Sequence, residues 1–211
     1  MYQVKTVVTH LLDENNYIIY QNGQALIVDP GSSPNRTKKA IEELSLTPLA
    51  ILITHGHADH IGALEIIRQF YDIPVYCSKE EQLWLKDSAY NMSPMLGMGE
   101  YTCQPAEKEY LLNQENTIGP FTFKALPTPG HTKGSTCLYF ENEGHPFVMT
   151  GDTLFKGSIG RSDFPGGDSE AIFPSIENHL FTLPEETIVY PGHNESSTIG
   201  NEKAHNPFFK H

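Results

Sequence analysis

A stretch of six residues carries four side chains that can bind a metal ion. They are His55, His57, Asp59 and His60. Neutral imidazole is the commonest metal ligand in proteins, and carboxylates bind the same divalent ions. A lone histidine is usually a surface residue or a core residue with its own hydrogen bond, but this density of ligand types has few explanations other than a metal site. The stretch therefore predicts metal binding.

Three later segments each place one more ligand-type side chain after an apolar strand and a bend that contains glycine. These side chains are His131, Asp152 and His193. Each segment alone is more typical of an ordinary turn. Together with the first four residues they make a set of seven candidate ligands. Because structural zinc is closed by four ligands and catalytic zinc keeps a position open, seven ligands indicate two ions, about 3.5–4 Å apart and sharing a carboxylate.

The residues on either side of the first cluster predict the elements that position it. An apolar run over residues 49–53 indicates a short buried strand. Apolar residues at positions 63, 66, 67 and 70 have the spacing of a helix. The cluster would then lie where a strand leads into a helix, which is a common place for sites in α/β proteins.

Turn signals divide the rest of the chain into further strands and helices. Asn22-Gly23 indicates a two-residue hairpin, and Ser33-Pro34 predicts the start of a helix. A later helix is expected over residues 169–180, where Pro174 should kink it or shorten its first turn. No internal repeat or linker is visible, so we expect a single domain over residues 1–211.

The order His-x-His-x-Asp-His, then His, Asp and His, resembles that of the metallo-β-lactamase-fold hydrolases. Within that superfamily the chain looks like the short bacterial members of the glyoxalase II group. Similar segments lie at residues 27–31, 151–155, 158–168 and 198–209, so the resemblance covers nearly the whole chain. It implies a fold of the α/β (α+β) class, a four-layer αββα sandwich.

The resemblance also implies how the ligands are shared between two divalent ions. The first ion would be held by His55, His57 and His131, the second by Asp59, His60 and His193, and Asp152 would bridge them. Zinc is the expected metal, although the same ligands accept iron or manganese. Asp59 would also position the nucleophile. Asp29 would help to orient the site, with an ordinary turn aspartate before Pro-Gly as an equally good interpretation.

The expected activity is hydrolysis of a 2-hydroxyacyl thioester, such as S-lactoylglutathione or the adduct of another small thiol, by a metal-bridging hydroxide. A thiolate leaves without a strong general acid, and no spare acid accompanies the ligands. Arg161 is a candidate for binding a substrate carboxylate, with an ion pair to Asp163 or Asp168 as the alternative. Only residues 194–211 follow the last ligand, too few for the helical extension that grips glutathione in the longer enzymes, so the thiol carrier stays open.

Two other activities remain open at this point. Persulfide dioxygenases look similar and use one iron held by two histidines and an aspartate. The corresponding residues here are His55, His131 and Asp152. These enzymes also have a Gly-Arg-Ser-Asp-Phe segment like residues 160–164. The other alternative is a lactonase or β-lactamase of the same fold. A metal-binding protein without catalytic activity is disfavoured, because storage or structural sites do not need a ligand set that leaves a position open.

Composition restricts the partners and the compartment. The formal charge is −12 and the 14 lysines and arginines are not clustered, which disfavours nucleic acid as a partner. There is no apolar stretch of roughly 20 residues and no secretory signal, so we expect neither a membrane span nor export. Three cysteines far apart in sequence fit a reduced, cytoplasmic protein, with Cys103 expected to be the most exposed. The oligomeric state is not predicted.

Residues 90–99 contain three of the five methionines together with glycine and proline. Methionine fills irregular shapes and suits adaptable binding surfaces. One interpretation is a flap that contacts the substrate over the metal site. The other is a loop packed on the outside of the fold.

Overall fold

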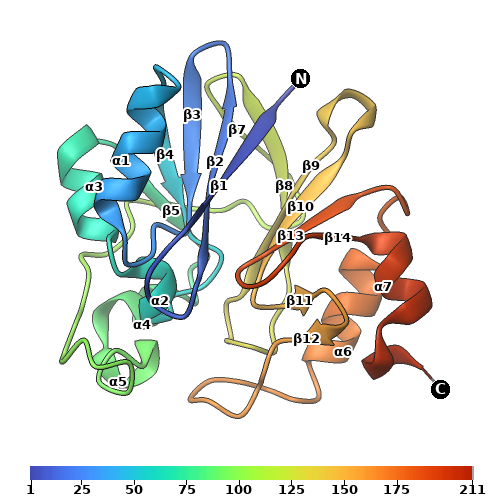
Figure 1. Cartoon of the computed structure of the whole chain (residues 1–211). Helices are drawn as coiled ribbons and strands as arrows, with labels where there is room; N and C mark the ends of the chain where they lie inside the picture. Colours follow the sequence, from blue (N-terminus) through green and yellow to red (C-terminus); the bar gives the residue numbers. More distant parts are fainter. Residues whose placement is uncertain (211) are drawn as a thin grey trace. The chain divides into compact units, whose positions relative to one another are not determined.

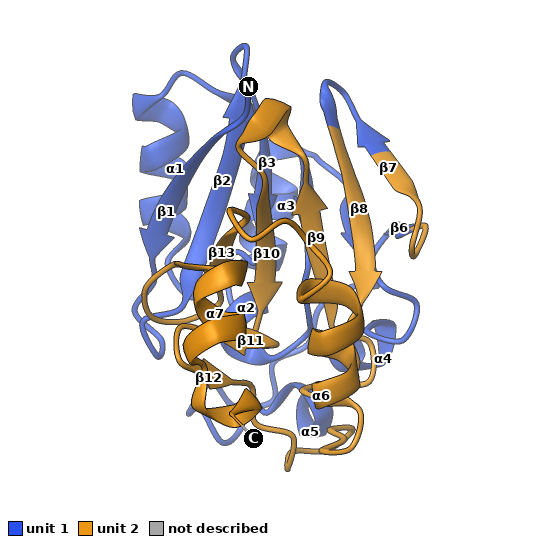
Figure 2. Cartoon of the chain, turned by 90° about the vertical axis from the view of Figure 1, so that its right-hand side faces the viewer, with its two compact units in different colours: residues 1–110, 117–121 blue, residues 111–116, 122–211 orange. Residues whose placement is uncertain are grey.

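The computed structural model describes residues 1–210, which divide into two compact units (Figure 2). Unit 1 comprises residues 1–110 and 117–121, and unit 2 comprises residues 111–116 and the chain from residue 122 onward. Each unit is built around one six-stranded sheet and has its own apolar core. The expected mixed α/β class, with two main sheets flanked by helices, is confirmed. That residues 1–211 form a single domain stays a prediction.

The sheet of unit 1 starts as an antiparallel meander and continues with parallel strands. Its strands, in spatial order, are β1 (Gln3–Val8), β2 (Asn15–Gln21), β3 (Gln24–Val28), β4 (Thr47–Leu52), β5 (Val75–Cys77) and β6 (Lys108–Glu109). Asn22 and Gly23 turn the chain between β2 and β3 with φ angles of 50° and 75°, the left-handed pair that a type I′ hairpin needs. The predicted hairpin is confirmed.

The helices of unit 1 follow its strands. They are α1 (Pro34–Glu43), α2 (Ala58–Ile61), α3 (Leu64–Tyr71), α4 (Gln82–Lys86) and α5 (Ser88–Asn91). Figure 1 shows α1 and α3 beside the sheet, and their buried residues Ile41 and Ile67 share a core with Ile27 and Ile51 of β3 and β4. The Ser33-Pro34 signal marks the start of α1, as predicted. The sheet and these helices hold the carboxyl end of β4 in place, and residues 53–57 leave the sheet there.

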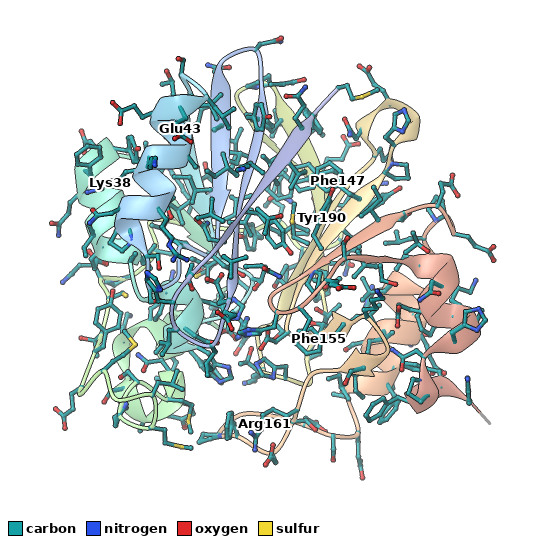
Figure 3. The ribbon with its side chains drawn as sticks, in the orientation of Figure 1. Lys38, Glu43, Phe147, Phe155, Arg161 and Tyr190 are labelled. Carbon is teal, nitrogen blue, oxygen red and sulfur yellow. The ribbon has the colours of Figure 1, made fainter. Side chains whose placement is uncertain are left out.

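The buried face of α3 differs from the prediction. Leu64 and Ile67 are buried, whereas Ile66 and Phe70 are 49% and 61% exposed. Ala63, Leu64 and Ile67 form the stripe that packs into the core of unit 1, and Ile66 and Phe70 lie outside this stripe. Phe70 is partly covered from within the unit, since the ammonium of Lys38 (labelled in Figure 3) lies 3.9 Å from its ring centroid.

All three cysteines are free and buried. The expectation that Cys103 is exposed is wrong, because its side chain lies in the core of unit 1 and its backbone N–H donates to the carbonyl of Leu85 at 2.7 Å. A polar sequence around it concealed this long-range contact. Burial raises the pKa of the Cys103 thiol to about 11, which keeps it protonated and unreactive at neutral pH.

The sheet of unit 2 carries three strands that run in the same direction. Its spatial order is β14 (Ser197–Thr198), β13 (Ile188–Pro191), β10 (Phe147–Gly151), β9 (Thr136–Phe140), β8 (Phe121–Pro127) and β7 (Glu115–Ile118). Residues 117–121, which end β7 and begin β8, are grouped with unit 1. β10 pairs in parallel with β13, and β9 is antiparallel to both β10 and β8. The carboxyl ends of β8, β10 and β13 therefore reach one edge of the sheet.

The remaining elements of unit 2 are short. They are a hairpin of β11 (Leu154–Phe155) and β12 (Ser158–Ile159), and the helical segments η1 (Asn142–Gly144), α6 (Ile172–Ser175), η2 (Ile176–Leu180), α7 (Ile199–His205) and η3 (Pro207–Phe209). The predicted helix over 169–180 starts only at Ile172, so Pro174 falls in the first turn, where no backbone N–H is required. Among residues 1–210 no helix has the length and apolar character needed to cross a membrane.

Candidate metal centre

Unit 1 brings together the four ligand-type residues of the first cluster. His55 and His57 lie between β4 and α2, and Asp59 and His60 lie in the first turn of α2. All four are buried. The ring of His55 is 4.9 Å from that of His57 and 4.1 Å from that of His60, measured between centroids. Nε2 of His60 is 3.8 Å from Oδ2 of Asp59.

Glycine at position 56 lets the chain pass close to α4. A Cβ on Gly56 would lie 2.5 Å from Cβ of Trp84, so no side chain fits between the two histidines. The N–H of Gly56 donates to Oε2 of Glu81 at 2.6 Å, and Glu81 is buried. A carboxylate from the start of α4 thus fixes the backbone between His55 and His57.

Asp29 fixes the tautomers of two of the histidines. Its Oδ1 accepts from the backbone N–H of Thr54 at 2.8 Å, and its Oδ2 accepts from the hydroxyl of Thr54 at 2.6 Å and from Nδ1 of His60 at 3.0 Å. Because the Thr54 hydrogen points at Asp29, the Thr54 oxygen accepts from Nδ1 of His55, 3.1 Å away. In both rings Nδ1 then carries the hydrogen and Nε2 presents a lone pair, the form of imidazole that binds metal.

The donor set of unit 1 fits a divalent cation. The ligand atoms of Asp29, His55 and His60 lie within 4.8 Å of one another. His55, His57 and His60 place three buried imidazoles close together, and imidazole is the commonest metal ligand in proteins. The carboxylate of Asp29 is already used by Thr54 and His60, which is the hydrogen bonding of a residue that orients ligands. Its effect on metal binding stays a prediction.

Unit 2 brings together the other three ligand-type residues, one after each of its three codirectional strands. His131 follows β8, Asp152 follows β10 and His193 follows β13. Oδ2 of Asp152 is 3.6 Å from Nε2 of His131 and 3.6 Å from Nε2 of His193. The carboxylate therefore stands between the two rings, as a shared ligand would.

These separations fit metal coordination better than direct hydrogen bonding. A distance of 3.6 Å is too long for an N–H···O bond. Two ligands that each lie about 2.0–2.2 Å from one ion at a tetrahedral angle are themselves about 3.4 Å apart. Nδ1 of His131 donates to the carbonyl oxygen of Arg161 at 2.7 Å, and because a carbonyl only accepts, Nε2 of His131 is the atom with the lone pair.

Arg161 contributes its backbone to this cluster and directs its side chain elsewhere. Its guanidinium donates from Nε and one terminal nitrogen to the two carboxylate oxygens of Asp163, both at 2.8 Å, and stacks 3.8 Å from the ring centroid of Phe164. Figure 3 labels it on the loop that follows β12. The guanidinium lowers the pKa of Asp163 to about 2. The ion pair to Asp163 is thus present, and the binding of a substrate carboxylate stays a prediction.

The segment of residues 90–99 folds back on unit 1. Met98 reaches α2, because its methyl group lies 3.4 Å from where a Cβ on Gly62 would be, and the hydroxyl of Tyr101 donates to the carbonyl of Ile61 at 3.1 Å. Met95 is 68% exposed. The segment therefore packs against the helix that carries Asp59 and His60, with one methionine left in solvent. Contact with a substrate stays a prediction.

Three further residues of this site were not recognised in the sequence: Thr54, Glu81 and Glu14. Thr54 reads as the end of an apolar strand, and Glu81 is one acidic residue in an ordinary helix start. Glu14 is fully buried, and its Oε2 accepts from the hydroxyl of Thr9 at 3.0 Å. Its carboxyl lies against Gly31, whose added Cβ would be 2.1 Å from Oε2. No local signal was available, since an acidic residue in a polar loop gives no sign of burial and Gly31 is near Glu14 only in the folded chain.

Replacing Glu14 by glutamine should stabilise the metal-free protein increasingly as the pH rises above 4.5. Burial raises the pKa of Glu14 well above its ordinary value of 4.5, and the neighbouring Asp29 and Asp59 add to this while His60 opposes it. The folded state thus holds this proton more tightly than the unfolded state, so the stability that Glu14 contributes is complete below pH 4.5 and falls as the pH rises. Each pKa unit of difference corresponds to about 1.4 kcal/mol.

Urea unfolding of both proteins in a chelator, at a series of pH values from 4.5 to 8.5, measures this effect. The glutamine variant should gain stability over the wild type progressively as the pH rises, because its amide keeps the carbonyl that Thr9 donates to and cannot ionise. Parallel pH profiles for the two proteins would show that Glu14 titrates alike in the folded and unfolded states.

The chain is similar in sequence to a protein superfamily and to individual bacterial proteins. The model of the metallo-beta-lactamase superfamily matches residues 11–193. The probable metallo-hydrolase YqgX of Bacillus subtilis is 43% identical over 197 residues, which are 93% of this chain and 92% of that protein. The hydroxyacylglutathione hydrolase GloC of Haemophilus influenzae is 37% identical over 187 residues, 87% of this chain and 86% of that protein.

Solved structures give the same result for the fold. The B3 metallo-beta-lactamase BLEG-1 superposes with a TM-score of 0.94 at 41% identity, over 99% of this chain and 100% of that chain. TTHA1623 in a di-iron-bound form superposes with a TM-score of 0.86 at 34% identity, over 97% of this chain and 99% of that chain.

Proposed function

This chain belongs to the metallo-beta-lactamase superfamily, and we propose that it is a binuclear hydrolase of 2-hydroxyacyl thioesters of a small thiol, such as S-lactoylglutathione. The superfamily and the His/Asp cluster of unit 1 make it a metallo-hydrolase. The number of ions, the thioester and the thiol are the proposal.

One observation carries the proposal most directly: in both units, histidine and aspartate side chains gather just beyond the carboxyl ends of strands, and Nδ1 of His55, His60 and His131 is held by a hydrogen bond. The proposal assigns one ion to His55, His57 and His131, and a second to Asp59, His60 and His193, with Asp152 shared. The hydrogen bonds to Nδ1 of His55, His60 and His131 support these assignments, because they leave Nε2 to bind metal. Zinc is the proposed metal. Iron is the alternative, because the similar protein TTHA1623 has a di-iron-bound form.

When bound, divalent ions would supply a nucleophile derived from water at neutral pH and would polarise the acyl carbonyl. The residues of the chain contribute orientation and a base. Asp59 is buried beside His60, and its carboxylate would hold the attacking water in line and accept its proton. The hydrogen bonds of Asp29 and of the Arg161 carbonyl keep the histidine rings from rotating. The protein need not protonate the leaving group, because a thiolate is stable near neutral pH.

The thioester is supported by similarity to GloC, a hydroxyacylglutathione hydrolase, over most of both chains. The three free cysteines, Cys77, Cys103 and Cys137, support a reducing compartment, and we place the enzyme in the cytoplasm, where such thiol adducts form. The substrate is small, and no macromolecular partner enters the proposal.

Metal analysis of the purified protein, followed by S-lactoylglutathione hydrolysis on the same sample, tests the proposal. We expect about two zinc ions, or a zinc and iron mixture, per chain, together with release of free thiol. Full metal occupancy without thiol release would overturn the thioesterase. Loss of hydrolysis in a chelator and its return on adding zinc would show that the metals are required.

Hydrolysis of a β-lactam or lactone is the second candidate, favoured by the 41% identity to the B3 metallo-beta-lactamase BLEG-1. A chromogenic cephalosporin and a simple lactone in the same assay separate it from the thioesterase. The persulfide dioxygenase is the third, and rests on residues 160–164. Oxygen uptake with glutathione persulfide, in a sample holding one iron per chain, would favour it over both hydrolases.

A further inference from the structure

The C-terminal helix α7 buries a carboxylate that the proposed mechanism does not use. Glu202 is fully buried, and Asn206, one turn later, is 1% exposed. Both lie in the segment of residues 198–209 that resembles the family in sequence. A buried carboxylate so far along the chain from the metal ligands needs a reason of its own, because its desolvation is costly unless hydrogen bonds compensate.

Glu202 accepts four hydrogen bonds. Its Oε2 accepts from the backbone N–H of Gly157 at 2.8 Å and from Nδ2 of Asn206 at 2.9 Å. Its Oε1 accepts from the hydroxyl of Ser197 and from Nδ2 of Asn201, the latter at 2.8 Å. Burial alone would raise the pKa of Glu202, but these bonds outweigh it and lower the pKa, so the carboxylate is ionised.

The partners of Glu202 belong to the two segments that follow metal ligands in unit 2. Gly157 is in the turn of the β11–β12 hairpin, which comes directly after Asp152, and Ser197 begins β14, which comes after His193. Asn206 adds a second tie, because its Nδ2 also donates to the carbonyl of Ser158 at 3.1 Å. The carboxylate therefore joins the hairpin, β14 and α7 at one point.

Backbone contacts in turn hold the hairpin against the residues that carry the metal ligands of unit 2. Gly160, just after β12, donates to the carbonyl of Thr153 at 3.2 Å, and a Cβ on it would lie only 1.7 Å from the carbonyl oxygen of Asp152. The next residue, Arg161, provides the carbonyl that accepts from Nδ1 of His131 at 2.7 Å. A shift of the hairpin would thus move the backbone beside Asp152 and the hydrogen bond that orients His131.

We propose that Glu202 is a positioning residue for the metal ligands of unit 2, acting through the β11–β12 hairpin on His131 and Asp152. The proposal rests on the proposed function only in that these residues bind metal. Of the four donors around the carboxylate, only the hydroxyl of Ser197 can also accept, so the NH₂ of an amide in its place would face at least one donor, and the remaining hydrogen bonds would lose the carboxylate charge that strengthens them. The hairpin would then loosen, and the spacing between Nε2 of His131 and Oδ2 of Asp152 would no longer be held.

Glu202→Gln tests this proposal, with Glu195→Gln as the matched control. Glu195 makes an exposed ion pair with Lys156 in the turn of the same hairpin. The control therefore also removes a carboxylate charge that links the segment after His193 to the hairpin. The zinc dissociation constant, measured by competition with a chromophoric chelator well below the melting temperature, is the readout. We expect about a tenfold weaker zinc site in Glu202→Gln and less than a twofold change in Glu195→Gln.

A merely structural role gives a different result. In that case Glu202→Gln would lower the melting temperature of the metal-free protein and leave the zinc affinity of the folded protein unchanged, which would overturn the proposal. If Glu202→Gln does not fold, Ser197→Ala removes one of the four bonds with less damage and should weaken zinc binding about threefold. Unchanged affinity in Ser197→Ala would then overturn it.

These outcomes are independent of the substrate. A wild type that binds zinc but releases no thiol would overturn the thioesterase, and a loss of zinc affinity in Glu202→Gln would still support the positioning role. A wild type that hydrolyses the thioester, with a Glu202→Gln variant that binds zinc normally, would overturn the positioning role alone. A wild type that binds no divalent metal would overturn both.

Discussion

Replacement of Asp59 by asparagine should lower kcat/KM for the thioester about a thousandfold while the fold persists. Asparagine keeps the volume of the buried side chain, but its amide is neither a charged ligand nor a base. Loss of a general base typically costs 10²–10⁴-fold in rate, and loss of a well-placed electrostatic contact costs a comparable factor. The fold should persist because a backbone hydrogen bond, from the N–H of His60 to the carbonyl of His57 at 2.9 Å, holds the first turn of α2.

Steady-state kinetics with S-lactoylglutathione, metal content and a thermal melt on the same preparation measure this result. Asp72→Asn is the matched control, since Asp72 is an exposed aspartate at the end of α3 in the same unit and its left-handed φ of 51° suits asparagine equally well. An Asp59→Asn enzyme with wild-type kcat/KM would sink the role given to Asp59. A variant that retains one metal but not two would identify which function of the carboxylate is lost.

The positions of three candidate ligands were predictable from the sequence, because each follows an apolar strand and a bend. Strand ends are encoded locally, in the run of buried residues and the glycine that follows, so His131, Asp152 and His193 could be placed without knowing the sheet. The parallel pairing of β10 with β13 then brings two of those ends to one edge. The family resemblance supplied the grouping around two ions, which no local pattern contains.

The residues that hold the ligands in place were not predictable, because they lie far away in sequence. Glu81 reaches Gly56 across 25 positions, and Glu202 reaches Gly157 across 45. Each reads locally as one more acidic residue on a helix. Periodicity also failed on α3, where Ile66 and Phe70 fit a helical spacing but face solvent. In a short helix with apolar residues on most sides, only the sheet it packs against decides which stripe is buried.

Asp29→Asn should weaken zinc binding 10- to 100-fold, the range typical for a residue that orients a metal-bound histidine. The substitution is clean, since Asp29 has a left-handed φ of 49° that asparagine tolerates, so the backbone need not move. The three groups that Asp29 accepts from are all donors: the N–H and hydroxyl of Thr54 and Nδ1 of His60. An amide oxygen facing the N–H of Thr54 would direct its NH₂ at the other two.

His60 would respond to that NH₂ by changing its tautomer, and this is what makes the prediction specific. With the amide donating to Nδ1, the hydrogen would move to Nε2 and remove the lone pair that binds the metal. Nitrogen chemical shifts of His60 in the metal-free protein report the tautomer, and chelator competition reports the affinity. Tight zinc binding with the Nδ1–H form intact would return Asp29 to the other interpretation, a turn aspartate before Pro-Gly. A change of tautomer together with a loss of affinity would make it the residue that prepares His55 and His60 to bind.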